Sequence, residues 1–154
     1  MTWALNILVA EDNSDDVFLL EQAFKRAEAP SRLIAVRDGI EALEYLSGEG
    51  RFIDRVTWPF PDVVLLDLNM PRKNGFEVLE WVRGDSHCAR LMVHVLTASS
   101  RVADVERAYA LHANTYTVKP ARLDDLVAFV RALHQWHRFV VLADAPAPQP
   151  SRFA

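Results

Sequence analysis

The chain has 154 residues, of which 51% are hydrophobic and 25% are charged, and its formal net charge is -4. This length and balance are ordinary for one soluble globular domain, and the acidic charge argues against a nucleic-acid partner. The sequence shows no signal peptide, no apolar run near the roughly 20 residues that span a bilayer, and only one cysteine, so we expect a cytoplasmic protein without membrane contact.

Apolar runs and helical periodicities alternate along the chain. Short apolar runs predict five strands, at residues 5–10, 32–36, 62–67, 91–97 and 115–118. Apolar residues at helical spacing predict five helices, at residues 14–29, 39–47, 74–84, 101–111 and 122–136. Because the strands are apolar on both faces, we expect a parallel sheet covered on both sides, and right-handed crossovers make a doubly wound α/β fold the simplest topology.

Local signals mark the ends of several helices. Asn13 or Ser14 can cap the first helix, and Pro30 prevents its continuation. Gly48 fits the C-terminal end of the second helix. A long irregular connection, residues 49–61, then precedes the third strand.

Polar side chains follow four of the predicted strands. Glu11 and Asp12 follow the first strand and Asp67 ends the third, whereas Thr97 ends the fourth and Lys119 follows the fifth. The carboxyl ends of parallel strands meet at one edge of the sheet, which is where open α/β sheets bind ligands. We therefore expect three carboxylates and one ammonium group to lie close together. Three carboxylates repel one another unless a cation offsets their charge, and a hard divalent cation, Mg²⁺ or Mn²⁺, suits oxygen ligands.

The residue types predict roles in phosphoryl transfer. Asp12 and Asp67 would bind the cation directly and Glu11 would bind through water, while the backbone carbonyl of Asn69 would supply a third protein oxygen. One Asp67 oxygen stays free to attack phosphorus and form an acyl phosphate.

Lys119 and Thr97 would contact the transferred group. The Lys119 ammonium is a compact charge suited to phosphate oxygens, and the Thr97 hydroxyl can donate to the same group. Taken singly, each residue has a structural alternative. A strand-end Asp is most often a turn residue, an acidic pair before a helix more often caps it, and the Lys and the Thr are ordinarily structural. Their joint occurrence at the ends of four strands is much harder to obtain by chance.

Four motifs make a resemblance specific. They are Leu8-Val9-Ala10-Glu11-Asp12-Asn13, Leu65-Leu66-Asp67-Leu68-Asn69-Met70-Pro71 with Gly75, Leu96-Thr97-Ala98, and Tyr116-Thr117-Val118-Lys119-Pro120. Together they resemble the receiver domain of two-component response regulators, over residues 5–136. The resemblance implies the flavodoxin-like fold, Mg²⁺-dependent phosphoryl transfer from a histidine kinase to Asp67, and a signalling protein that hydrolyses its own phosphate slowly rather than an enzyme. It also implies that Thr97 and Tyr116 form a switch pair, in which Thr97 moves toward the phosphate and Tyr116 follows inward.

Two further features refine the resemblance. His112-Ala113 stands where the family usually has Gly-Ala, which leaves the turn before the fifth strand open, and we expect His112 to face solvent. The connection at residues 48–61, Asn69 and the run Pro71-Arg72-Lys73-Asn74-Gly75 resemble the single-domain regulators that partner bacterial and cyanobacterial phytochromes. This narrower resemblance implies a bacteriophytochrome as the cognate kinase and a homodimer.

The C-terminal segment, residues 137–154, extends beyond the receiver domain that we expect at residues 1–136. Its apolar run Phe139-Val140-Val141-Leu142-Ala143 has no place in a completed sheet. The run either folds back over its own domain or forms an extended arm that grips a second copy; we expect the arm, because exposed apolar segments mark interfaces and exchange of identical arms gives a closed dimer. Trp136 would anchor that interface or pack on its own core. The Pro-rich residues 145–150 should be extended.

We therefore expect a phosphorylatable receiver without an output domain of its own, which acts by binding a partner or by passing its phosphoryl group to a histidine phosphotransfer protein. The alternative is a pseudo-receiver that is never phosphorylated, but such modules generally lose an acid, the Thr or the Lys. An aspartyl-nucleophile phosphatase would need a second Asp where Asn69 stands. A flavin module would need a Ser/Thr/Gly-rich loop in place of Glu11-Asp12-Asn13.

Overall fold

The computed structural model describes residues 4–143. These residues form strands β1 (Leu5–Ala10), β2 (Ser31–Val36), β3 (Val63–Leu66), β4 (Met92–Thr97) and β5 (Thr115–Val118), helices α1 (Ser14–Arg26), α2 (Gly39–Ser47), α3 (Gly75–Gly84), α4 (Val102–Ala110) and α5 (Leu123–His137), and the short 3₁₀ helix η1 (Gly50–Phe52). The strands pair in parallel in the order β2-β1-β3-β4-β5. This order confirms the predicted doubly wound, flavodoxin-like fold.

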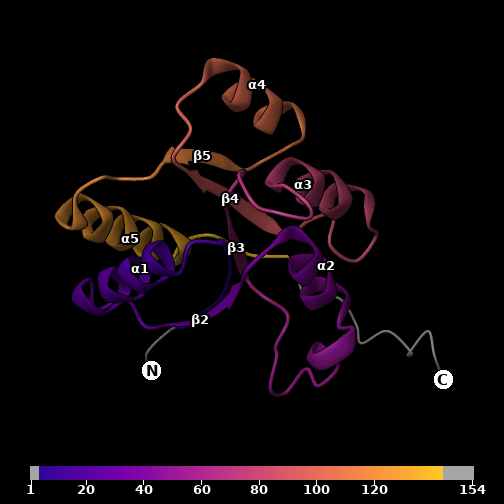
Figure 1. Cartoon of the computed structure of the whole chain (residues 1–154). Coiled ribbons are helices and arrows are strands. Elements are labelled where there is room, and N and C mark those ends of the chain that lie inside the picture. The colour runs from indigo at the N-terminus through magenta and orange to yellow at the C-terminus, as the bar shows by residue number, and fades with distance from the viewer. Residues whose placement is uncertain (1–3, 144–154) are drawn as a thin grey trace.

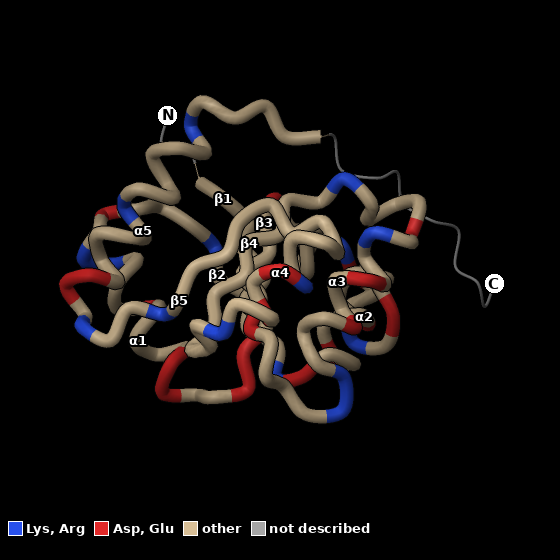
Figure 2. The backbone as a smooth tube through the Cα atoms, turned by 90° about the horizontal axis from the view of Figure 1, so that it is seen from above, with Lys and Arg blue, Asp and Glu red and all other residues tan. Residues whose placement is uncertain are grey.

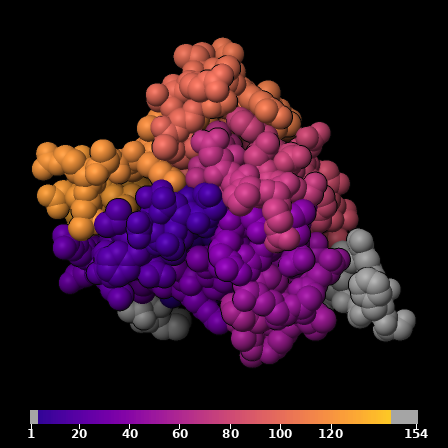
Figure 3. Space-filling model, viewed as in Figure 1, coloured from indigo at the N-terminus to yellow at the C-terminus, as the bar shows by residue number. Residues whose placement is uncertain are grey.

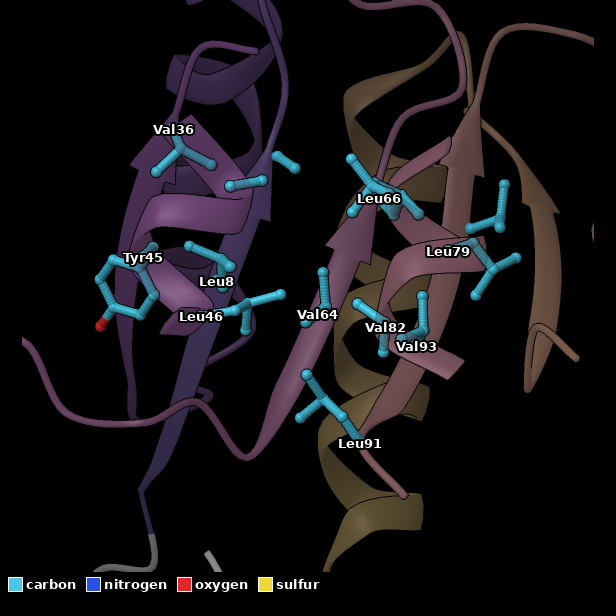
Figure 4. Packing of buried hydrophobic residues seen from close by; sticks show 14 of the residues in the cluster. Leu8, Val36, Tyr45, Leu46, Val64, Leu66, Leu79, Val82, Leu91 and Val93 are labelled. Atoms are coloured by element: carbon cyan, nitrogen blue, oxygen red, sulfur yellow. The ribbon is translucent and has the colours of Figure 1, made fainter. Parts of the chain in front are cut away.

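Helices cover both faces of the sheet (Figure 1). Alternate residues along β1 point to opposite faces: Ile7 packs in one core cluster with α1 and α5, and Leu8 packs in the other with α2 and α3. Figure 3 shows α1 lying against α5 on one side of the molecule, with α2 and α3 on the other. Figure 4 shows how Leu66 and Val93 of the sheet meet Leu79 of α3. Charged residues lie mainly on the surrounding helices and loops (Figure 2).

The predicted end of the first helix is wrong by three residues. Helix α1 begins as expected, with the Asn13 side chain accepting hydrogen bonds from the amides of Asp15 and Asp16, but it ends at Arg26. Glu28 has a φ of 51°, and the amide of Ala29 donates to the carbonyl of Phe24 at 3.2 Å. This left-handed turn satisfies the last carbonyls of the helix and redirects the chain before β2. The other predicted bounds agree with the structure within one residue.

The long connection between α2 and β3 is held against α2. Phe52 is buried, its ring lies 4.9 Å from that of Tyr45 and 5.3 Å from that of Trp58, and the Tyr45 hydroxyl donates to the Pro59 carbonyl at 2.7 Å. The Arg55 guanidinium donates to the carbonyl of Leu46, in the last turn of α2, at 2.9 Å. These contacts fix a segment that the sequence describes only as irregular.

The turns at Gly48 and His112 also adopt the left-handed backbone conformation. Gly48, at the C-terminal end of α2, has a φ of 68°, as its position predicts. His112, in the turn before β5, is exposed and has a φ of 64°. The exposure confirms the expectation for His112, and the φ gives a physical reason why glycine suits this position.

The start of the C-terminal segment lies beside its own domain. Leu142 packs against the cluster formed by α1 and α5, whereas Phe139 and Val141 are 85% and 95% exposed. Residues 144–154, including the Pro-rich stretch, lie outside the described residues. Across residues 4–143, no helix is long and apolar enough to cross a membrane.

Candidate functional site

The predicted site residues meet at the carboxyl edge of the sheet. The amide of Asp67 donates to the Ala10 carbonyl at 3.0 Å, and the amide of Lys119 donates to the Thr97 carbonyl at 2.7 Å. The amide of Glu11 donates to the Val36 carbonyl at 3.0 Å. These bonds extend the ladder pattern one step beyond the strands, so the backbone of each residue is fixed where its strand ends.

Three carboxylates converge at this edge. Oxygen atoms of Glu11, Asp12 and Asp67 all lie within 4.8 Å of one another. Glu11 and Asp67 are buried, and Asp12 is exposed. Burial raises the pKa of Glu11 to about 7, against hydrogen bonds from Lys119 and the Asn13 amide, and the nearby charge of Asp67 raises it further. A donor set of hard oxygens with one side open to water fits a divalent cation such as Mg²⁺ or Mn²⁺.

Lys119 supplies the positive charge of the site. Its ammonium donates to Glu11 Oε2, to Asp16 Oδ2 at 2.9 Å and to Asp67 Oδ2 at 3.4 Å. Burial alone would lower the pKa of Lys119, but hydrogen bonds to Glu11 and Asp16 and the charge of Asp67 raise it above its usual range. The ammonium group therefore stays charged among the carboxylates.

Asp16 is a site residue that the sequence analysis missed. It lies in the first turn of α1, where acidic residues are common because they favour the helix dipole. Its position one turn before Leu20, which is buried, was a signal that this side chain faces inward.

The predicted switch residues, Thr97 and Tyr116, lie near the site and differ in the hydrogen bonding of their hydroxyl groups. Thr97 is fully buried, and its hydroxyl has no hydrogen-bond partner within the described part of the chain. A buried hydroxyl without a partner costs free energy, so its persistence calls for an explanation. The Tyr116 hydroxyl is half-buried and donates to the Ser99 carbonyl at 2.9 Å, while the Ser99 hydroxyl donates to Asp104 Oδ2 at 2.5 Å.

Asn69 lies beside the acids with its side chain exposed, and its amide donates to Asp67 Oδ1 at 3.3 Å. The residues predicted from the strand ends are thus brought together. The three acids lie within 4.8 Å of one another, and Glu11 and Asp67 contact Lys119. Asn69 contacts Asp67, and Thr97 shares a backbone hydrogen bond with Lys119.

Comparison with known proteins places the chain in a family. The model of the response regulator receiver domain matches residues 7–131. Response regulator Rcp1 of Synechocystis sp. is 36% identical over 140 residues, which are 90% of this chain and 93% of that protein. The crystal structure of its Mn²⁺-bound form has a TM-score of 0.79 at 35% identity and covers 91% of this chain and 99% of that one.

Two further structures are similar over most of the chain. The phosphorylated cyanobacterial phytochrome response regulator RcpA has a TM-score of 0.83 at 35% identity and covers 92% of this chain and 100% of that one. Response regulator RPA3017, described in red light signaling of R. palustris, has a TM-score of 0.82 at 39% identity, covering 93% and 99%. The chain therefore belongs to the response regulator receiver domain family and is a signalling protein.

Proposed function

We propose that this protein receives a phosphoryl group on Asp67 from a phosphohistidine of a sensor histidine kinase. The observation that carries the proposal is the meeting of three carboxylates and one ammonium group at the carboxyl edge of the sheet. Charge of both signs at one point is what a phosphoryl group and a divalent cation require together.

The acidic side of the site would hold the cation. Asp12, Asp67 and the Asn69 carbonyl would bind it directly and Glu11 through water, as Mg²⁺ or Mn²⁺ binds to a few carboxylates while keeping several waters. A bound divalent cation would offset the repulsion among the carboxylates and the negative charge of the phosphoryl oxygens.

Transfer would then proceed by in-line displacement. An Asp67 carboxylate oxygen attacks phosphorus and forms a P–O bond while the P–N bond of the donor phosphohistidine breaks. The leaving imidazole keeps the electron pair of that bond and takes up a proton. The product is an acyl phosphate on Asp67.

Lys119, Thr97 and Tyr116 would sense this product. Lys119 would pair with phosphoryl oxygens, and the unpartnered hydroxyl of Thr97 would donate to another of them. Tyr116 would leave the Ser99 carbonyl and follow inward, shifting an equilibrium between two existing surfaces rather than creating a new one. The face formed by α4, β5 and α5, where Tyr116 lies, is the surface that a partner would read.

We propose two kinds of partner. The similarity to RcpA and RPA3017 supports a phytochrome as the cognate kinase. A histidine phosphotransfer protein would accept the phosphoryl group from Asp67 in a relay. We place these events in the cytoplasm, since a lone, buried cysteine suits a reducing compartment.

A homodimer through the C-terminal segment, residues 137–154, is a further part of the proposal. The large exposure of Phe139 and Val141 supports it. A groove of about 420 Å³, lined in part by Met92 and Arg90, runs beside Val141 and could seat an arm from a second copy. Trp136 is half-exposed, with its ring 4.9 Å from that of His137, so it has a free side for such a contact.

The phosphorylation proposal is tested by labelling with a small phosphodonor. Acetyl phosphate with Mg²⁺ should add one phosphoryl group to the full chain, measured by intact mass. Asp67→Asn should abolish the addition, and Asp124→Asn, an exposed acid at the start of α5, should not. Equal labelling of the Asp67→Asn variant would overturn the site assignment. A second assay, phosphotransfer from purified candidate kinases, tests the phytochrome partner, since only the cognate kinase should label the chain within seconds.

The dimer is tested separately. Deleting residues 138–154 should give a monomer in light scattering, because it removes the exposed apolar run. An unchanged dimer mass would refute the arm and leave the phosphorylation proposal intact.

A further inference from the structure

The loop between β3 and α3, residues 67–74, sets where two proposed metal ligands lie, because Asp67 begins it and Asn69 follows two residues later. The first half of this loop is anchored by apolar packing: Leu68 and Met70 are buried in the core cluster with α2 and α3. The second half, residues 71–74, has no buried residue and is held by polar contacts instead.

Those polar contacts reach the start of α2. Arg72 Nε and Nη2 lie 2.9 and 2.8 Å from Asp38 Oδ2, and the Gly39 amide donates to the Lys73 carbonyl at 3.1 Å. The backbones approach so closely that a Cβ on Gly39 would lie 2.2 Å from the Lys73 carbonyl oxygen. The second half of the loop therefore rests directly on Asp38 and Gly39.

Arg72 makes its contact from an unfavourable backbone conformation. Its φ is 63°, in the left-handed region that residues with a Cβ rarely adopt. Such strain persists where the surrounding contacts over-determine it, and it concentrates near functional sites. Three contacts surround this position: the ion pair with Asp38, the hydrogen bond from the Gly39 amide to the Lys73 carbonyl, and the Lys73 amide donating to the Pro71 carbonyl at 2.7 Å.

Both carboxylate oxygens of Asp38 accept hydrogen bonds, one of them from Arg72. Its Oδ1 accepts from the Glu41 amide at 2.8 Å, which caps α2 and leaves Oδ2 for Arg72. Burial would raise the pKa of Asp38, but the hydrogen bond from Glu41 and the Arg72 guanidinium lower it below its usual range. The carboxylate is therefore charged at neutral pH.

We propose that Arg72 is a positioning residue for the metal site: its ion pair with Asp38 holds the loop so that the Asp67 carboxylate and the Asn69 carbonyl converge with Asp12. The inference rests on the proposed function, since it presupposes a divalent cation at Asp12 and Asp67. Holding ligands in place before binding lowers the conformational entropy that binding must remove. Residues 71–74 lack apolar anchors, so the ion pair with α2 restricts the path by which the chain leaves Asn69.

The test measures the affinity of the full chain for MgCl₂ and MnCl₂ by calorimetry. Arg72→Gly removes the guanidinium and also relieves the backbone strain, so its melting temperature should stay near that of the unsubstituted chain. Asp38→Asn keeps an oxygen to cap α2 at the Glu41 amide. Each variant should weaken metal binding by up to about tenfold, the lower end of the loss when a partner of a metal ligand is removed, because Leu68 and Met70 still anchor the loop.

The double variant and a matched control separate this effect from general damage. Arg72→Gly combined with Asp38→Asn should weaken binding no more than either change alone, because the two residues act as one pair. Arg51→Gln removes another arginine–carboxylate pair of α2, with Glu41, and should leave metal affinity unchanged. In acetyl phosphate labelling, the half-saturating Mg²⁺ concentration should rise in the Arg72 and Asp38 variants while the rate at saturating Mg²⁺ stays the same.

The outcomes are distinguishable. If the unsubstituted chain binds no divalent cation, the proposed function and this inference both fail. If it binds the cation and the Arg72 and Asp38 variants bind equally well, or if their losses add in the double variant, only the positioning role is overturned. A loss equal to that of Arg51→Gln would also count against it.

Discussion

Two buried polar clusters on the same sheet differ in whether paired opposite charges offset the cost of burial. At the carboxyl edge, Glu11 and Asp67 are buried beside the Lys119 ammonium, which donates hydrogen bonds to both carboxyl groups. Between β4 and α5, His94 and His137 are 1% and 0% exposed, and their Nε2 atoms lie 3.0 Å apart. Burial lowers the pKa of His94 to about 4, with His137 lowering it further, so this cluster is neutral at physiological pH.

The difference separates a reactive cluster, Glu11, Asp67 and Lys119, from a structural histidine cluster, His94 and His137. Buried opposite charges can re-pair when a cation or a phosphoryl group arrives, and this makes the carboxyl edge suited to chemistry. The two neutral imidazoles only bridge elements, with His94 Nδ1 also 2.6 Å from the Thr115 hydroxyl, so they join β4, β5 and the end of α5. Burial of ionisable groups by itself therefore does not distinguish the proposed site from the histidine pair; the Lys119 ammonium among carboxyl groups does.

The largest expected effect comes from removing the positive charge of the reactive cluster. Lys119→Met should slow labelling by acetyl phosphate at saturating Mg²⁺ about 100-fold or more, because the phosphoryl oxygens lose their buried cationic partner. Lys25→Met, which removes an exposed lysine in the last turn of α1, is the control and should label normally. Normal labelling of Lys119→Met would remove the distinction between the two clusters.

The histidine cluster should instead make the free energy of unfolding depend on pH. The folded-state pKa of His94, about 4, lies below its ordinary value of 6.5, so the unfolded chain takes up the proton first and stability is lost as pH falls from 6.5 toward 4. The loss attributable to His94 is about 3 kcal/mol across that window. In urea titrations, His94→Leu should have a correspondingly shallower pH slope.

Neighbouring groups and a control complete that experiment. His137 is faced by Asp62, whose charge raises its pKa, and by His134, which lowers it, but burial dominates and the pKa of His137 is lowered. His87→Gln changes an exposed histidine and should keep the original slope. Identical slopes for His94→Leu and the original chain would show that the pair is not held neutral by burial.

A smaller effect is expected at a strained position outside both clusters. His112→Gly should raise the free energy of unfolding by about 1 kcal/mol, since it relieves a left-handed φ at an exposed residue. Its backbone carbonyl, which accepts from Arg83 Nε at 2.9 Å, is retained. Urea unfolding measures the gain, and labelling should not change. A loss of stability would mean that contacts of the His112 imidazole stabilise the fold by more than the left-handed φ destabilises it.

The smallest effect should come from Asp16, an acid beside the reactive cluster. The Asp16 side chain is 39% exposed, so solvent screens its pair with Lys119. Asp16→Asn should change stability by less than about 1 kcal/mol and labelling by about twofold at most. An effect as large as that of Lys119→Met would show that Asp16 contributes to labelling as much as Lys119 does.

The reactive cluster can be predicted from the sequence but the histidine cluster cannot, for a physical reason. Glu11, Asp67 and Lys119 each stand at the end of an apolar run, and parallel strands bring such ends together. His94 lies inside a strand and His137 at a helix end, 43 residues apart, and no local pattern relates them. Asp16 was missed because acids in a first helical turn have an ordinary explanation in the helix dipole.

The amino-acid sequence by itself determined the alternation of strands and helices, a cap for α1 at Asn13 or Ser14, the doubly wound topology and the strand-end residues of the carboxyl edge, because periodicity and capping are short-range properties. Only the tertiary structure decided which charges pair. Lys119 meets Glu11 across 108 residues, and Arg72 meets Asp38 across 34. Such contacts depend on how helices and loops pack around the sheet, and the backbone strain at Arg72 and His112 likewise follows from where each loop must lead.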